Sequence, residues 1–299
     1  MESGHLDLSA GTLLAHALAA AIARKSGIKA LSLKGPVAEH YALRPPRVSA
    51  DADILIEPAR FAEFCEGLER HGWHTRVGRA TPALLPQHSV TYIHTDWPCD
   101  IDVHWMFPGF FADAADAFDA LWASRQPVIV AHTPVQAPSK AGAAVIMALH
   151  AERDRRSPKH VEEHELVMKA LIETFTATER DEFVGIARAG KAIWALRDYF
   201  YDADLGAVAI DADLEQQRLW ELFSNQVDDA SSIAWWQRVR TASWAHKPRW
   251  ILRAIWVSRL DIPRNEAEEV PSRSEMWKYQ VRRWRRGLEA TMRYVRQGR

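Results

Sequence analysis

The chain has 299 residues, of which 47% are apolar and 26% are charged, and its formal net charge is −1. This is the profile of a soluble globular protein, with enough chain for one large domain or two ordinary ones. Two cysteines, Cys65 and Cys99, are too few for a disulfide framework or a zinc cluster, so we expect a reducing, cytoplasmic compartment. The sequence shows neither an apolar run of transmembrane length nor a signal-peptide pattern, so we expect neither a transmembrane helix nor a signal peptide.

The first part of the chain predicts alternating helices and strands. Apolar residues recur at helical spacing over Leu8–Ser26, and Gly27 is a suitable C-cap for that helix. A short apolar strand is expected over Ile28–Leu33, followed by the turn Lys34-Gly35 and a helix over 36–43 that begins with proline. The consecutive prolines at positions 45 and 46 make the next segment a loop.

Beyond that loop the pattern predicts a strand over 52–57 and a helix over 58–70. Further strands are expected over 73–77, 89–94 and 100–105, so this half is mixed α/β. After about Pro134 the pattern becomes helical, with helices expected over 141–152, 159–174, 177–201 and 213–226. We therefore predict an α/β domain over residues 1–135 and a helical domain over residues 136–299 with a basic, tryptophan-rich C-terminus.

Two aspartates one residue apart, Asp51 and Asp53, open the apolar run Ile54–Ile56. On a strand, residues i and i+2 point to the same face, so the two carboxylates would project side by side. A divalent cation is the usual way to neutralise such a pair. The later acidic strand would bring a third carboxylate to the same place, and both Asp100 and Asp102 lie on one face of it if the strand is regular.

The turn Lys34-Gly35 joins a strand to a helix. Unpaired backbone N–H groups at such a junction favour an anion, Gly35 allows a ligand to approach closely, and Lys34 adds a cation. The alternative interpretation is a tight turn beside a solvated lysine. A phosphate-binding turn together with a set of carboxylates indicates metal-dependent phosphoryl chemistry.

These residues resemble the uncharacterised nucleotidyltransferase family of the polymerase-β superfamily. The resemblance depends on the run from Leu31 to Gly35, on Tyr41 and Arg47, and on the run from Asp51 to Ile56. The later Asp102-Val103-His104-Trp105 is similar to the D-L-H-W element of the same family. The likeness covers about residues 28–107 and fades to helical character beyond them, where His150 is similar to a helical histidine of the family's second domain.

The resemblance implies an α+β fold, with a polymerase-β-like mixed sheet flanked by helices and followed by a mainly helical domain. Lys34 and Gly35 would stand where the wider superfamily has a Gly-Ser phosphate turn. The spacing to His104-Trp105 favours Asp102 over Asp100 as the third carboxylate. The implied site has Asp51, Asp53 and Asp102 as catalytic and metal-binding residues, and Lys34, Gly35, Arg47 and His104 as substrate-binding residues.

Some of these positions have a plainer interpretation. Arg47 would grip phosphate oxygens or the acceptor with its guanidinium fork, or it is an arginine in a solvated loop. His104 would touch phosphate or acceptor, or it is a half-buried histidine at a strand end. Both alternatives stay open on the sequence alone.

The activity that the resemblance implies is Mg²⁺-dependent transfer of a nucleoside monophosphate from an NTP, with ATP as the expected nucleotide, to an acceptor. Family members are often found with genes for ribosomally made, modified peptides, including lasso peptides. A modified or phosphorylated peptide is therefore one expected acceptor, alongside small hydroxylated molecules. The alternative hypothesis is a non-catalytic nucleotide- or nucleic-acid-binding protein on a transferase scaffold; the full acidic set argues against it.

Two charged segments remain. Histidines and acids over 150–164 suggest a metal site, but the segment lacks a His-Glu-x-x-His pattern, and we do not favour it. Arg153 or Lys159 in this segment would be suited to hold the triphosphate. The basic segment 272–299 would bind nucleic acid or an anionic membrane, but a surface helix whose tryptophans pack down is the favoured interpretation.

Overall fold

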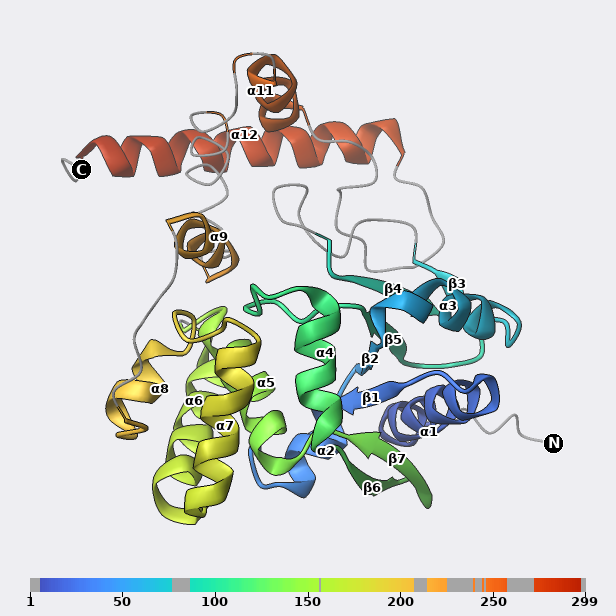
Figure 1. The fold of residues 1–299 in the computed structure, drawn as a ribbon. Helices are drawn as coiled ribbons and strands as arrows, with labels where there is room; N and C mark the ends of the chain where they lie inside the picture. The colour runs from blue at the N-terminus through green and yellow to red at the C-terminus, as the bar shows by residue number, and fades with distance from the viewer. Residues whose placement is uncertain are drawn as a thin grey trace. The chain divides into compact units, whose positions relative to one another are not determined.

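The computed structural model describes residues 6–76, 87–155, 157–206, 214–224, 239, 244, 246–256 and 272–296 (Figure 1). The chain divides into two compact units, Met1–Thr75 with His88–Trp220 and Arg76–Gln87 with Glu221–Arg299. The sheet and the helices over 140–202 belong to the first unit, while the boundary at residue 135 stays a prediction about domains. Within the described ranges, no helix combines the length and the apolar character that crossing a bilayer requires.

A five-stranded mixed sheet forms the centre of the first unit. Its strands are β1 (Ala30–Leu33), β2 (Asp51–Ile56), β3 (His74–Thr75), β4 (Ser89–Ile93) and β5 (Asp100–His104). Their order is β1-β2-β5-β4-β3, with β2 and β5 parallel and the other neighbours antiparallel. The α+β class with a mixed sheet, expected from the sequence, is confirmed.

One face of this sheet is apolar and packs on α1 (Leu8–Ser26) and α3 (Phe61–Glu69). The alternate residues of β2 and β5 that point to this face are aliphatic: Ala52, Ile54, Ile56, Ile101 and Val103. Helix α1 begins at the N-cap Asp7 and ends at Gly27, whose φ of 64° is the left-handed C-cap conformation. Because the two faces alternate along each strand, this packing directs the aspartates to the opposite face.

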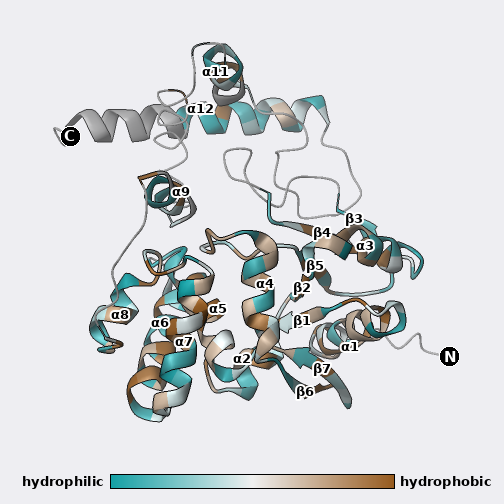
Figure 2. Cartoon of the chain, in the orientation of Figure 1, coloured by the Kyte–Doolittle hydropathy of each residue, from teal (hydrophilic) through white to brown (hydrophobic). Residues whose placement is uncertain are grey.

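The remaining elements of the first unit begin with α2 (Gly35–His40), the short helix η1 (Pro58–Arg60) and α4 (Ala114–Ala123). A hairpin of β6 (Gln126–Val130) and β7 (Thr133–Ala137) follows. After it come α5 (Lys140–Glu152), α6 (Pro158–Lys169), the short π-helix η2 (Ala170–Thr174), α7 (Ala177–Ala189) and α8 (Arg197–Asp202). Helix α5 contacts α2, α6 and α7 and is buried along nearly its whole length. Figure 2 accordingly shows brown over much of α5, with teal on α6 and α7.

Three further helices are described: α9 (Leu214–Ser224), which spans the division between the two units, and α11 (Lys247–Ile255) and α12 (Arg273–Arg296) of the second unit. In the second unit Trp256, Trp277 and Trp284 form a cluster of edge-to-face and tilted rings. The Nε1 of Trp284 donates to the backbone oxygen of Ile255 at 2.8 Å. These tryptophans are 42%, 49% and 40% exposed, so they pack on one another without being fully covered by the described residues.

The single helix predicted over 177–201 is wrong, because the chain breaks between α7 and α8. Helix α7 ends at its C-cap Gly190, where an added Cβ would lie 2.1 Å from Cδ1 of Phe110. Its backbone oxygen accepts from the N–H groups of Phe111 and Ala112, and Lys191 follows with a φ of 51°. The helix predicted over 159–174 consists of α6 and the π-helix η2 that follows it directly. Helix α4 and the β6–β7 hairpin were not anticipated.

Candidate active site

The parallel pairing of β2 with β5 brings the acidic residues together. Asp51 lies opposite Asp100 and Asp53 lies opposite Asp102. Residues at i and i+2 share a face, so His104 projects from the same face as Asp102. Potential ligand atoms of Asp53, Asp102 and His104 all lie within 4.8 Å of one another.

Asp53 is the most buried carboxylate of this group, at 4% exposure. Its Oδ1 lies 2.7 Å from Nζ of Lys34 and 3.0 Å from Nε2 of His104. Burial alone would raise the pKa of Asp53, but the Lys34 ammonium and the hydrogen bond from His104 hold that pKa well below its usual range. The ionised carboxylate can only accept, so Nε2 of His104 carries the proton. The buried Nδ1 of His104 has no partner among the described residues.

The other two predicted carboxylates lie in different surroundings. Asp102 is half-buried, and its Oδ1 accepts from Oγ1 of Thr91 on β4 at 2.6 Å. Asp51 begins β2. The negative charge of Asp53 and, as a smaller contribution, burial raise the pKa of Asp51 to about 6. Negative charge is therefore crowded at the start of β2 in a way that a cation would relieve.

The turn predicted at Lys34-Gly35 directs a cation into this group. Lys34 has a φ of 48° and Gly35 a φ of 35°, and a non-glycine residue in this region is uncommon and often found at functional sites. Burial lowers the pKa of Lys34, but the charges of Asp53 and Asp51 outweigh that effect and raise it, so the ammonium stays charged. The turn thus holds a charged amine against the carboxylates.

His16 on α1 lies beneath this turn and was not singled out in the sequence. Its side chain is fully buried, and neither ring nitrogen has a hydrogen-bond partner among the described residues. A Cβ added to Gly35 would lie 3.5 Å from Nε2 of His16. Burial lowers the pKa of His16 to about 4, so the ring is neutral at neutral pH. The available signal was a histidine on the otherwise small or apolar buried face of an alanine-rich helix, which also carries Thr12.

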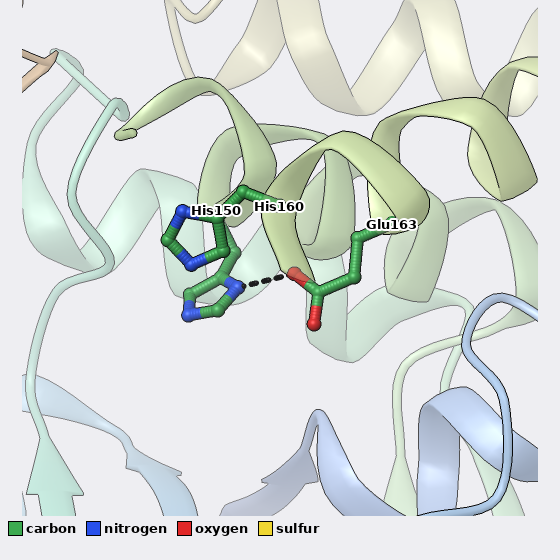
Figure 3. A group of neighbouring side chains, drawn as sticks. All are labelled: His150, His160 and Glu163. Atoms are coloured by element: carbon green, nitrogen blue, oxygen red, sulfur yellow. Dashed lines mark hydrogen bonds and ion pairs between the residues drawn. The ribbon is translucent and has the colours of Figure 1, made fainter. Parts of the chain in front are cut away.

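Arg47 does not lie among the carboxylates' direct partners. It forms an ion pair with Glu163 on α6, which also accepts from Nδ1 of His150 on α5 at 2.8 Å. Figure 3 shows His150 and His160 beside Glu163, with the bond to His150 dashed. Burial would raise the pKa of Glu163, but the hydrogen bond and charge of His150 and the charge of Arg47 lower it to about 2.

Two more cations of the α5–α6 region are within electrostatic reach of the carboxylates. Burial lowers the pKa of Arg153, with the charges of Asp53 and Asp102 acting in the opposite direction. Burial also lowers the pKa of Lys159, which feels the charges of Glu163, Arg47, Lys34 and Asp51. Helix α6 and the segment before it therefore place positive charge near the acidic strands.

The predicted site residues thus form two neighbouring groups, one around Asp53 and one around Glu163. Lys34 and His104 contact Asp53, Asp102 is its register partner, and Asp51 precedes it on the same strand face. Gly35 forms the turn after Lys34, whereas Arg47 is joined to Glu163 and His150. Glu163 was considered only as part of a charged segment, because the 116 residues that separate it from Arg47 leave no local pattern.

Comparison with known proteins gives the following likenesses. The antibiotic-resistance factor ANT(2'')-Ia is 18% identical, with a TM-score of 0.40, and the match covers 66% of this chain and 98% of that one. An antigenic nucleotidyltransferase-like protein from Paracoccidioides brasiliensis is 11% identical, with a TM-score of 0.39, covering 64% of this chain and 94% of that one. No curated protein matches.

The sequence profile of the uncharacterised nucleotidyltransferase family matches residues 12–196. This range is more than half of the chain and extends from α1 to the segment before α8. It contains both the carboxylate strands and the helices that carry His150 and Glu163. The protein is a transferase that belongs to the uncharacterised nucleotidyltransferase family.

Proposed function

We propose that the protein uses Mg²⁺ to transfer a nucleoside monophosphate from an NTP, with ATP as the expected nucleotide, to a hydroxyl group of an acceptor. The observation that carries the proposal is the register of β2 with β5, which places Asp53 opposite Asp102. Asp51 supplies a second carboxylate on the same face of β2. Carboxylates on two adjacent central strands are held rigidly, as a metal site requires.

The donor set fits Mg²⁺. Hard cations prefer carboxylate oxygens, and Asp51, Asp53 and Asp102 offer these from one sheet face. His104 donates to Asp53, so we assign His104 the role of orienting this carboxylate rather than that of a ligand. When bound there, the cation supplies Lewis-acid stabilisation of the charge that develops on the transferred phosphoryl group.

The surrounding cations support binding of the triphosphate. Lys34 reaches Asp53 from the turn, and Arg153 and Lys159 are within electrostatic reach of the carboxylates. We propose that these three side chains and Arg47 bind phosphate oxygens of the NTP. Fixed positive charge of this kind stabilises both the bound triphosphate and the pyrophosphate that leaves.

Asp102 is the proposed general base. Thr91 Oγ1 donates to its Oδ1 at 2.6 Å and so fixes the orientation of the carboxylate. In the proposed step the acceptor hydroxyl gives its proton to Asp102, its oxygen bonds to the α-phosphorus, and the bond between the α-phosphorus and the bridging oxygen breaks to release pyrophosphate. Burial of Asp53 and its pairing with Lys34 suit Asp53 to binding rather than to proton transfer.

The acceptor that we propose is a modified or phosphorylated peptide or a small hydroxylated molecule. Cys65 and Cys99 are both free and buried, which supports the proposal that the protein works in the reducing cytoplasm. The test is to incubate the protein with each NTP, Mg²⁺ and candidate acceptors and to search by mass spectrometry for an added nucleotide. Asp51→Asn and Asp53→Asn should lose turnover while circular dichroism shows a retained fold; full activity in either variant would show that the metal assignment is wrong.

A further inference from the structure

Glu163 on α6 is a buried carboxylate that no step of the proposed reaction uses. It is 1% exposed, although glutamate is rarely buried unless it is paired. It joins two other elements, because it forms the ion pair with Arg47 of the loop before β2 and accepts from Nδ1 of His150 on α5 at 2.8 Å (Figure 3). The Glu163 side chain therefore connects the loop before β2 with α5 and α6.

A metal site is one explanation of this cluster. Ligand atoms of His150, His160 and Glu163 lie within 4.8 Å of one another. However, Arg47 already neutralises Glu163, and the charge of Lys159 also acts on this region. A second cation would have to displace the Arg47 guanidinium into positively charged surroundings. The ion pair is therefore the better account of why a carboxylate is buried here.

Arg47 is fixed at its backbone as well as at its side chain. Its N–H donates to Oε1 of Glu39 at 3.2 Å, and its carbonyl oxygen accepts from Nη2 of Arg44. Arg44 in turn pairs with Glu39, so this loop is tied to α2. The Glu163 ion pair engages Nη2 of Arg47, and a guanidinium has further N–H groups on its other nitrogens. Its side chain keeps 25% exposure, which leaves it accessible to an anion.

We infer that Glu163 is a positioning residue that holds the Arg47 guanidinium, and with it the His150 imidazole, in the orientation that receives the phosphates of the NTP. The inference rests on the proposed function, because it assigns Arg47 to the triphosphate. Glu163 itself does not touch substrate; it fixes in advance a side chain that would otherwise lose rotamer freedom on binding. A bidentate guanidinium is effective only when its plane is oriented.

The test measures binding of MgATP and of the other Mg²⁺–NTP complexes by isothermal titration calorimetry. Glu163→Gln should weaken binding about 10-fold, the order expected for a hydrogen bond to a charged group. The control is Glu162→Gln, an exposed glutamate on the same helix, which should bind like the wild type. Melting temperatures of both variants show whether the fold is retained.

A double-mutant cycle decides whether Glu163 acts through Arg47. In the Arg47→Ala background, adding Glu163→Gln should change the affinity by less than about 2-fold. If the double mutant instead loses affinity by the product of the two single-mutant factors, Glu163 acts independently of Arg47 and the inference is wrong. Glu163→Asp is the variant to use if Glu163→Gln does not fold. Its shorter side chain keeps the charge but moves the carboxylate away from Arg47, so the affinity for the NTP should still fall. An unchanged affinity would contradict the positioning role.

The remaining outcomes separate the two proposals. If the wild type binds no NTP in the presence of Mg²⁺, the proposed function fails and the inference fails with it. If the wild type binds and Glu163→Gln binds equally well, only the inference fails. If elemental analysis finds a stoichiometric metal in the wild type that Glu163→Gln has lost, the cluster is a metal site and the positioning role is wrong.

Discussion

Nζ of Lys34 lies 2.7 Å from Oδ1 of Asp53, so a residue of the predicted phosphate turn is ion-paired with a predicted metal ligand. Both groups are nearly buried, with side-chain exposures of 16% and 5%. Lys34 thus neutralises the carboxylate to which the proposed cation would bind. In the proposed complex, the Lys34 ammonium would have to interact with both that carboxylate and the triphosphate. If the proposed function holds, this relationship makes the lysine a competitor of the metal as well as a ligand of the substrate.

The first prediction concerns this competition. Lys34→Met should raise the affinity for Mg²⁺ or Mn²⁺ in the absence of nucleotide several-fold, because Asp53 loses its resident cation. The same variant should lose about 100-fold or more in nucleotidyl transfer, because the positive charge on the phosphates is gone. Titration followed by Mn²⁺ electron paramagnetic resonance measures the first effect. Lys29→Met, which removes an exposed surface lysine, should change neither quantity.

The second prediction distinguishes the two acidic positions of β5. Asp102→Asn should reduce turnover by about 100-fold to 10,000-fold, the range for loss of a general base. Folding should be retained, because Thr91 can donate to the amide oxygen as it does to the carboxylate. Asp100→Asn, opposite Asp51 in the register, should have a much smaller effect on turnover. A larger loss in the Asp100 variant would mean that the third carboxylate is misassigned.

The third prediction is a pH dependence of stability that arises from His16. The folded-state pKa of His16 is about 4, below its ordinary value of 6.5, because the ring is buried. As pH falls below about 6.5, the unfolded chain takes up a proton that the folded protein refuses until about pH 4, so stability falls across that window. The loss is on the order of 3 kcal/mol for this group, at about 1.4 kcal/mol per pKa unit.

Urea denaturation between pH 4 and pH 8 measures this effect. His16→Leu removes the titrating group and should flatten the curve over the window from about 6.5 to 4. His150, whose pKa is lowered to about 3 by burial, acts in the same direction and keeps part of the slope. An unchanged slope in His16→Leu would show that the ring is not held neutral by burial.

The fourth prediction uses two glycines a few residues apart. Gly190→Ala should destabilise the protein by about 1–3 kcal/mol, because the new methyl group would overlap the ring of Phe110. Gly185→Ala, inside α7 with no atom within 4 Å of the added Cβ, should be stabilising by up to about 1 kcal/mol. Denaturation midpoints of the pair test whether the close contact with Phe110 excludes a side chain at position 190. Equal effects of both changes would contradict it.

The local part of the site could be predicted from the sequence because its signals are local. The alternation around Asp51 and Asp53 fixes which face they share, and the turn Lys34-Gly35 directly follows an apolar strand. The later acidic strand offered both Asp100 and Asp102 as the third carboxylate, and the resemblance to the family then favoured Asp102. That Asp102 is the register partner of Asp53 is a property of the sheet and could not be read from spacing.

The parts that were missed depend on contacts between distant segments. Gly190 sits in a pattern compatible with one long helix, and the ring of Phe110, which leaves no room for a side chain at this position, lies far earlier in the chain. The β6–β7 hairpin alternates buried and exposed residues, but Pro127, Pro134 and the exposed apolar Ile129 hide that alternation in the sequence. Glu163 resembles any helical glutamate until its partner Arg47 is known.

The order of the strands limits the motion of the two carboxylates. Asp53 and Asp102 lie on β2 and β5, which are interior strands with hydrogen-bonded neighbours on both sides. Fraying at an edge therefore leaves them in place, and their amide protons should exchange with solvent only through opening of the whole sheet. Under the proposed function, the carboxylates would therefore be a rigid part of the site, and any adjustment to a substrate would fall to Lys34 and Arg47, which lie outside these two strands.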